Sequence, residues 1–281
     1  MKHTTSISVS ILLMLFLLNC QFLEKRTGPK VDPNVVKEVN VGKALAAKLA
    51  KKYGLIKDEP FTRYINLVGK SMAIYSSRQE LDFRFGILDT EDVNAFACPG
   101  GFVLVTKGAI DIMETEAELA SLLSHELSHV TLKHSGDFEE KGASILDVIS
   151  AIMAPGGDLV SSVTKGAVDG LVNQFFEKGR KKEEEIESDK AGTIYLSQAG
   201  YDLESSIIYL KKLDKSQHNE VALKTHPPTS ERISELNKFI TDNKLNMRGK
   251  TNLQRFRAEY ASFAQRYEKQ KPKATKTAST L

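Results

Sequence analysis

The sequence predicts an α+β protein that is mostly α-helical, with one small antiparallel sheet directly before its most regularly patterned helix. Three observations support this class. Apolar residues recur at helical spacing in several segments between positions 34 and 268. Short segments of alternating or apolar residues, separated by a turn signal, occur between positions 81 and 106. The chain has 281 residues, of which 41% are hydrophobic, and is therefore long enough for one large folded domain.

The helix predicted over residues 115–134 has the clearest pattern in the chain. Thr115 and Glu118 have the spacing of a capping box at its start. Apolar residues then recur every three or four positions, as on the core-facing side of a helix. These residues are Leu119, Leu122, Leu123, Leu127, Val130 and Leu132.

Three short strands are predicted before this helix. Residues 81–88 alternate between apolar and polar, and residues 94–97 and 102–106 flank the turn signal Cys98-Pro99-Gly100-Gly101. An edge of such a sheet can pair with an extended peptide through main-chain hydrogen bonds. Asn94, Ala95, Phe96 and Ala97 are therefore candidate substrate-binding residues, although a purely structural hairpin explains the spacing equally well.

His125, Glu126 and His129 form a His-Glu-x-x-His pattern inside the helix. Histidines four residues apart lie on one helix face, where both imidazoles can bind one zinc ion at about 2.0–2.1 Å. Glu126 then lies beside the metal and can act as the general base. An ordinary helix with two solvated or core histidines is the alternative. His134 lies off the ligand face, and we interpret it as a histidine favoured by the helix dipole.

Zinc needs a third protein ligand, and the charged segment 177–195 offers several carboxylates. Glu185 and Asp189 lie on a helical stripe that continues to Gly192 and Leu196, so they are predicted to point inward. A glutamate from a later helix is a common third ligand. Spacing alone leaves four candidates open, namely Glu183, Glu184, Glu185 and Glu187.

Further helices are predicted on both sides of the motif, at 34–54, 59–77, 203–213 and 230–243, with an amphipathic C-terminal helix at 251–268. Two apolar stretches, 142–153 and 159–176, predict a helical hairpin that serves as core, as a lid or as a membrane contact. The formal charge of +3 does not indicate a nucleic-acid partner.

The N-terminus has the pattern of a lipoprotein-type signal peptide over residues 1–19. The apolar run ends in Leu17-Leu18-Asn19-Cys20, which resembles a bacterial lipoprotein box and implies lipidation of Cys20. Residues 20–33 then form a tether, residues 34–250 the catalytic domain, and residues 269–281 a disordered basic tail. We therefore expect a membrane contact through the lipid on Cys20.

Four motifs occur in order along the chain. They are Asn94-Ala95-Phe96-Ala97-Cys98-Pro99-Gly100-Gly101, His125-Glu126-Leu127-Ser128-His129, Glu185-Ile186-Glu187-Ser188-Asp189, and Thr225-His226-Pro227-Pro228 with Arg232. Together they resemble the zinc metallopeptidases typified by the HtpX membrane protease and the CaaX prenyl endopeptidase, particularly their periplasmic lipoprotein branch. The resemblance implies a gluzincin fold with one zinc ion.

Carried onto this sequence, the resemblance makes His125, His129 and Glu185 the metal ligands and Glu126 the catalytic base. It makes Asp189 the carboxylate that orients a ligand histidine. His226 is implied to lie near the metal, as an oxyanion donor or as an occupant of the open position in a latent enzyme. Arg232 is implied to fix that loop or to contact the developing charge. Ser188 replaces the usual alanine of the third motif.

The expected function is zinc-dependent endopeptidase activity on unfolded or misassembled cell-envelope proteins, in a periplasm-facing lipoprotein of the bacterial inner or outer membrane. The alternative is a latent chaperone or assembly factor of the outer membrane that retains the metalloprotease fold.

Overall fold

The computed structural model describes residues 32–134, 180–216 and 226–270. The chain divides into two units, Met1–Val36 and Lys37–Leu281, and the described part of the first unit is limited to the start of helix α2. The predicted signal peptide, the lipidation site Cys20, the apolar hairpin and the tail beyond residue 270 lie outside the described residues. So does the tether up to residue 31.

The sheet has three strands, β1 (Arg84–Leu88), β2 (Ala95–Cys98) and β3 (Phe102–Thr106), in the order β1-β3-β2. β2 pairs with β3 antiparallel, whereas β1 pairs with β3 parallel. The sheet is therefore mixed, and the expectation of an antiparallel sheet is wrong for the β1–β3 pair. Consecutive strands do alternate in direction, but β3 lies between the other two. Alternation along the sequence does not reveal which strands become neighbours.

The turn between β2 and β3 is held by helix α2 (Pro33–Tyr53). A short 3-10 helix, Pro99–Gly101, forms this turn, and Gly100 has a φ of 68°, which favours glycine. The carboxylate of Glu38 accepts the N–H of Gly100 at 3.0 Å and a hydrogen bond from Arg78 at 2.6 Å. Gly42 permits this close approach, because an added Cβ would lie 1.7 Å from the Pro99 carbonyl oxygen. Glycine positions thus fix α2 against the sheet.

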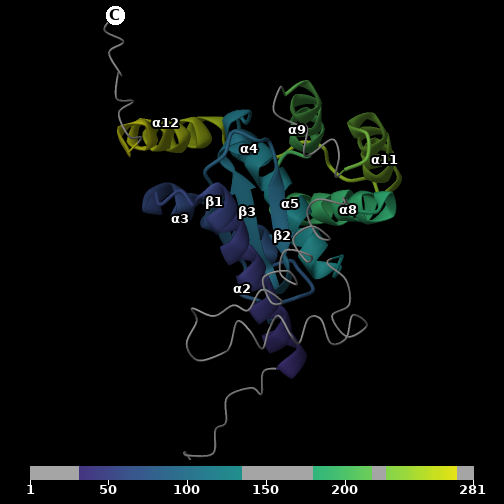
Figure 1. Cartoon of the computed structure of the whole chain (residues 1–281). Helices are drawn as coiled ribbons and strands as arrows, with labels where there is room; N and C mark the ends of the chain where they lie inside the picture. Colours follow the sequence, from purple (N-terminus) through teal and green to yellow (C-terminus); the bar gives the residue numbers. More distant parts are fainter. Residues whose placement is uncertain (1–31, 135–179, 217–225, 271–281) are drawn as a thin grey trace, which may run out of the picture. The chain divides into compact units, whose positions relative to one another are not determined.

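Helix α3 (Glu59–Ala73) packs against the C-terminal helix α12 (Leu253–Gln270), as Figure 1 shows. The rings of Phe61 and Phe263 stack with their centroids 4.4 Å apart, and both side chains are fully buried. α12 continues to Gln270, two residues into the segment predicted to be disordered. Among the described helices, none is long and apolar enough to span a membrane.

Helix α5 (Glu116–Thr131) occupies the centre of this arrangement and packs against α3, β2, α8 and α9. Thr115 caps its start by accepting the N–H of Glu118 at 3.2 Å. The Glu118 carboxylate accepts the N–H of Glu114, one residue earlier than a standard capping box requires. The other helices in the described residues are α4 (Lys107–Asp111), α8 (Lys182–Gln198), α9 (Glu204–Lys215) and α11 (Thr229–Asp242).

Candidate metal centre

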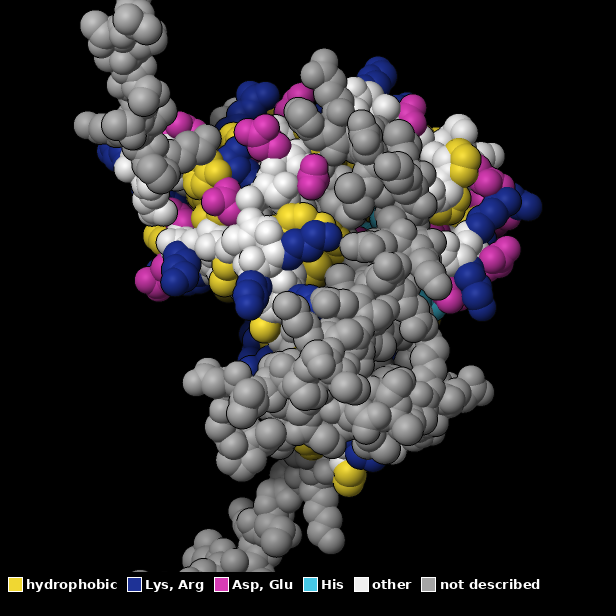
Figure 2. All heavy atoms as spheres, viewed as in Figure 1, with side chains coloured by type: hydrophobic (Ala, Val, Ile, Leu, Met, Phe, Trp, Pro, Cys, Tyr) yellow, Lys and Arg dark blue, Asp and Glu magenta, His cyan; other side chains and the backbone are white. Residues whose placement is uncertain are grey.

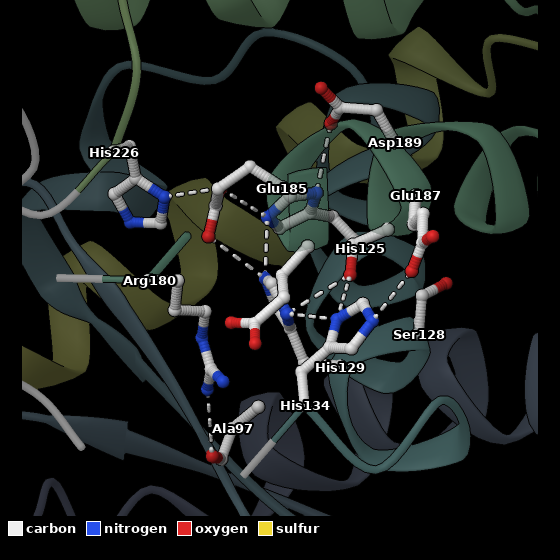
Figure 3. A network of polar contacts seen from close by, with 12 residues as sticks. Ala97, His125, Ser128, His129, His134, Arg180, Glu185, Glu187, Asp189 and His226 are labelled. Atoms are coloured by element: carbon white, nitrogen blue, oxygen red, sulfur yellow. Dashed lines mark hydrogen bonds and ion pairs between the residues drawn. The ribbon is translucent and has the colours of Figure 1, made fainter. Parts of the chain in front are cut away.

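Three side chains from two helices converge on one point. His125 and His129 project from the same face of α5, and their Nε2 atoms lie 3.1 Å apart. Glu185 projects from α8, with its carboxylate oxygens 3.4 Å from His125 Nε2 and 3.3 Å from His129 Nε2 (Figure 3). Two ligands of a tetrahedral zinc ion at about 2.0–2.1 Å lie about 3.3 Å apart. The spacing of these three groups therefore fits a zinc ion.

The electrostatics of this cluster also favour a cation. Glu185 is fully buried, and its Oε1 makes no hydrogen bond in the described structure, although an imidazole lies next to it. Burial lowers the pKa of His129 well below its ordinary value, so that its imidazole is neutral. Burial alone would raise the pKa of Glu185, but the surrounding imidazoles lower it well below its ordinary value. A neutral imidazole and a buried carboxylate thus present lone pairs to a common point.

Asp189 orients the first histidine. Its Oδ1 lies 2.9 Å from His125 Nδ1, and Arg232 donates to both Asp189 oxygens at 2.7 and 2.8 Å. Burial and the charge of Arg232 oppose protonation of His125, but Asp189 outweighs them and raises the pKa of His125 to about 9. Without metal, a proton on His125 supplies the positive charge that the cluster favours. Metal binding at neutral pH should therefore release a proton.

Replacing Asp189 with asparagine should weaken zinc binding by about 10- to 100-fold, because the orienting carboxylate of a ligand histidine is lost. A competition titration against a chromophoric chelator measures this affinity. Glu183→Gln, the corresponding amide substitution at an exposed position of the same helix, is the control and should leave the affinity unchanged. Equal affinity of Asp189→Asn and the control would contradict the role of Asp189.

His226 and Arg232, the two site residues predicted from the fourth motif, have different positions relative to the metal cluster. His226 Nδ1 lies 2.5 Å from Glu185 Oε2, and ligand atoms of His125, Glu185 and His226 fit within 4.8 Å of one another. His226 is therefore close enough to the cluster to reach the open metal position. Arg232 is buried, and its guanidinium is occupied by Asp189. Arg232 therefore stabilises the site through its contact with Asp189, and its Nη1 lies 3.8 Å from Glu185 Oε2.

A cavity opens beside Glu126, and its lining includes the buried residues Glu126 and His125 and the partly exposed His226. It contains about 590 Å³ of space, part of it open to solvent. One side is apolar and is formed mainly by α9 and α11, which the sequence patterns did not connect with the site. The apolar residues there are Val93, Leu122, Tyr209, Leu210, Leu213 and Leu236.

The predicted substrate strand lies next to this cavity. Asn94 and Ala95 line it, whereas Phe96 is buried in the cluster between α2 and the sheet. β2 is an edge of the sheet in the part of the chain that the structure describes. The carbonyl of Ala97 accepts a hydrogen bond from Arg180 Nη2 at 3.4 Å, as drawn in Figure 3. No motif singled out Arg180, because it precedes α8 in a run of similar charged residues.

Two further residues, which the sequence patterns did not connect with the metal ligands, lie near the second histidine. His134 follows the end of α5, and its Nδ1 lies 3.1 Å from His129 Nδ1. The hydroxyl of Ser188, which sequence analysis noted only as a replacement for alanine, lies 3.0 Å from the same atom. Cys98 is fully buried, and burial raises the pKa of its thiol, which is typical of a small core residue.

Comparison with known proteins places this geometry in a family. The chain is 27% identical over 219 residues to the beta-barrel assembly-enhancing protease of Yersinia pestis, covering 72% of this chain and 43% of that protein. It is 25% identical over 218 residues to the Escherichia coli K12 protein of the same name, with the same coverage. The match to the mitochondrial metalloendopeptidase OMA1 of Schizosaccharomyces pombe is 25% over 190 residues, or 65% of this chain and 54% of that protein.

The chain thus spans less than half the length of the two bacterial relatives. Residues 61–240 match the profile of Peptidase family M48, and this range contains every side chain of the metal cluster. Because the match extends over more than half of the sequence, the chain belongs to Peptidase family M48.

Proposed function

We propose that this protein is a zinc-dependent endopeptidase that hydrolyses peptide bonds in unfolded or misassembled proteins of the bacterial cell envelope. One observation carries the proposal: the ligand atoms of His125, His129 and Glu185 converge at 3.1–3.4 Å, and the buried residue Glu126 lines the same cavity as His125. Two imidazoles and one carboxylate with a neighbouring glutamate are the parts of a metallopeptidase site. Membership of Peptidase family M48 supports the same reaction.

The residues around the cluster have separable roles in this reaction. Zinc bound there supplies Lewis acidity, which polarises a carbonyl group and makes water more acidic. Glu126 accepts the proton of the attacking water and returns it to the leaving nitrogen. Asp189 keeps His125 in the tautomer that leaves its Nε2 free, and Arg232 keeps Asp189 charged and in place.

The cavity and the sheet edge provide a place for an extended substrate. Strand β2 can add a peptide along its outer side, which requires a substrate without competing structure of its own. The apolar wall formed by Leu210, Leu213 and Leu236 then accepts an apolar side chain next to the scissile bond. Apolar side chains become available when an envelope protein is unfolded or unassembled. The name of the bacterial relatives, beta-barrel assembly-enhancing protease, agrees with this substrate class.

Lipidation of Cys20 would attach the enzyme to a membrane with its catalytic domain in the periplasm. The support is the sequence Leu17-Leu18-Asn19-Cys20 after an apolar run. Figure 2 shows basic and acidic side chains interspersed on the described surface of one face. Cell fractionation of a Cys20→Ala protein tests this proposal, because the variant should leave the membrane fraction.

The hydrolase proposal is tested with the full chain, loaded with zinc and incubated with reduced, unfolded lactalbumin. We expect fragments whose cleavage points lie next to apolar residues, detected by mass spectrometry. A chelator should abolish cleavage, and an excess of zinc should restore it. Folded lactalbumin is the matched substrate control. A protein that binds one zinc ion but never cleaves the unfolded substrate would overturn the proposal.

A second candidate function rests on His226. Its Nδ1 lies 2.5 Å from Glu185 Oε2, so that it competes with substrate for the region in front of the cluster. This contact favours a latent site in a chaperone or assembly factor of the outer membrane. A substitution of Glu126, the proposed catalytic base, distinguishes the two candidate functions, because only the endopeptidase requires Glu126 in the cell.

A further inference from the structure

The two ligand histidines are held in different ways. His125 Nδ1 faces the charged Asp189–Arg232 pair. His129 is fully buried, and within the described structure its Nδ1 faces two groups without formal charge, Ser188 Oγ at 3.0 Å and His134 Nδ1 at 3.1 Å. These two groups also lie 3.1 Å from each other. The three atoms form a nearly equilateral triangle behind the metal cluster.

Assigning protons to this triangle gives one consistent arrangement. A histidine that binds a metal through Nε2 must carry its proton on Nδ1, so His129 Nδ1 is a donor. At the far end, His134 Nε2 lies 3.2 Å from a carboxylate oxygen of Glu187. A carboxylate accepts, so His134 Nε2 carries the proton and His134 Nδ1 is an acceptor.

The Ser188 hydroxyl connects the two ends, because it can accept and donate at the same time. His129 Nδ1–H donates to Ser188 Oγ, Ser188 O–H donates to His134 Nδ1, and His134 Nε2–H donates to Glu187. Every donor in this series of hydrogen bonds has its own acceptor. If the hydroxyl is removed, His134 Nδ1 still lies within hydrogen-bond distance of His129 Nδ1.

We propose that Ser188 and His134 are positioning residues that together hold the Nδ1–H of His129 and so orient its Nε2 toward zinc. The proposal rests on the zinc site proposed above and assigns the second histidine a partner that differs from the carboxylate of the first. This series of hydrogen bonds, the relay from His129 through Ser188 and His134, ends at Glu187. The side chain of Glu187 is 64% exposed, whereas Asp189 is almost buried. His129 is therefore held by two partly redundant hydrogen-bond acceptors, whereas His125 is held by one buried charged group.

The test compares two double variants that differ in whether residue 134 carries a polar amide or two methyl groups of similar size. Ser188→Ala/His134→Asn keeps an oxygen near the position of the His134 Nδ1 atom, whereas Ser188→Ala/His134→Leu replaces it with a methyl group of similar size. Zinc affinity is measured in the full chain by competition with a chromophoric chelator, without reference to activity. We expect the leucine variant to bind zinc about 10- to 100-fold more weakly than the unaltered protein, and the asparagine variant to lose less than about threefold. Ser197→Ala, on the same helix, is the control.

Equal zinc affinity of the asparagine and leucine variants would overturn the relay. If the unaltered protein binds no zinc, the proposed function itself fails. Zinc binding by the unaltered protein together with equal affinity of the two double variants overturns the relay alone, so the two failures are distinguishable. A second measurement needs no variant: in the cobalt-loaded protein, both ligand histidines should give hyperfine-shifted Nδ1–H proton signals that exchange slowly with water. Fast exchange of the signal assigned to His129 would also overturn the proposal, because the His129 proton would then be unprotected.

Discussion

Glu126→Gln should lower the rate of peptide hydrolysis by about 10³-fold while the protein still binds one zinc ion. Glutamine has nearly the same shape as glutamate, so the cavity wall that contains Glu126 is preserved. Its amide cannot accept a proton from water or return one to a leaving amine. The three ligand side chains are unchanged in this variant, because Glu126 is not one of the groups that converge on the metal position. The variant should therefore hydrolyse peptides more slowly and still contain one zinc ion.

The measurement is cleavage of unfolded lactalbumin together with zinc content by atomic absorption. Glu183→Gln provides the control, since this glutamate is exposed on α8. Cleavage at the unaltered rate in Glu126→Gln would exclude Glu126 as the base. In cells, a Glu126→Gln protein that still rescues the loss-of-function phenotype would favour the latent chaperone or assembly factor.

Much of the site was predictable because its chemistry is local in sequence. A spacing of four residues on one helix brings His125 and His129 to one face, and the structure has their Nε2 atoms 3.1 Å apart. The third group comes from α8, and no local rule selects among four neighbouring glutamates. The resemblance to a family indicated Glu185, and among the candidates Glu183, Glu184, Glu185 and Glu187 this is the fully buried one.

The parts that the sequence did not predict depend on contacts between distant segments. The order of the strands is decided by packing, and so is the pairing of His134 with Ser188, 54 positions apart. His134 lies one residue off the usual ligand spacing, a position that helical periodicity assigns to the helix surface. The helix in fact ends at Thr131, and Lys133 has a φ of 57°, so the chain turns and carries His134 back toward His129. Periodicity cannot describe a residue beyond the end of its helix.

The start of helix α5 depends on another buried carboxylate, that of Glu116. It is fully buried at the first position of α5 and accepts hydrogen bonds from four side chains. Tyr64 of α3 donates at 2.8 Å and Tyr201, after α8, at 2.7 Å. Asn252 donates at 2.7 Å, and Arg255 of α12 donates through two nitrogens. One carboxylate thus joins α5 to three other parts of the fold.

Glu116→Gln should lower the free energy of unfolding by about 3 kcal/mol at pH 7, because a buried, charge-assisted network loses its acceptor. The amide NH₂ of glutamine would face donors, and at least one of them would lose its partner. Glu59→Gln is the matched control: Glu59 is likewise the first residue of its helix, but its side chain is 87% exposed in a surface ion pair with Arg63. We expect the control to change stability by less than about 1 kcal/mol.

The difference between Glu116→Gln and the unaltered protein should depend on pH in one direction. Burial alone would raise the pKa of Glu116, but hydrogen bonds from Arg255, Tyr201 and the other donors lower it below its ordinary value of 4.5. A carboxyl group with a lowered folded-state pKa stabilises the protein fully above its unfolded-state pKa and loses that contribution as the pH falls through the folded-state value. Urea unfolding followed by circular dichroism should therefore give the full deficit at pH 7 and a smaller one below about pH 4.5. A deficit that stays constant over this range would show that the contribution of Glu116 does not depend on the ionisation of its carboxyl group, which would contradict the role of this carboxylate as the charged acceptor at the start of α5.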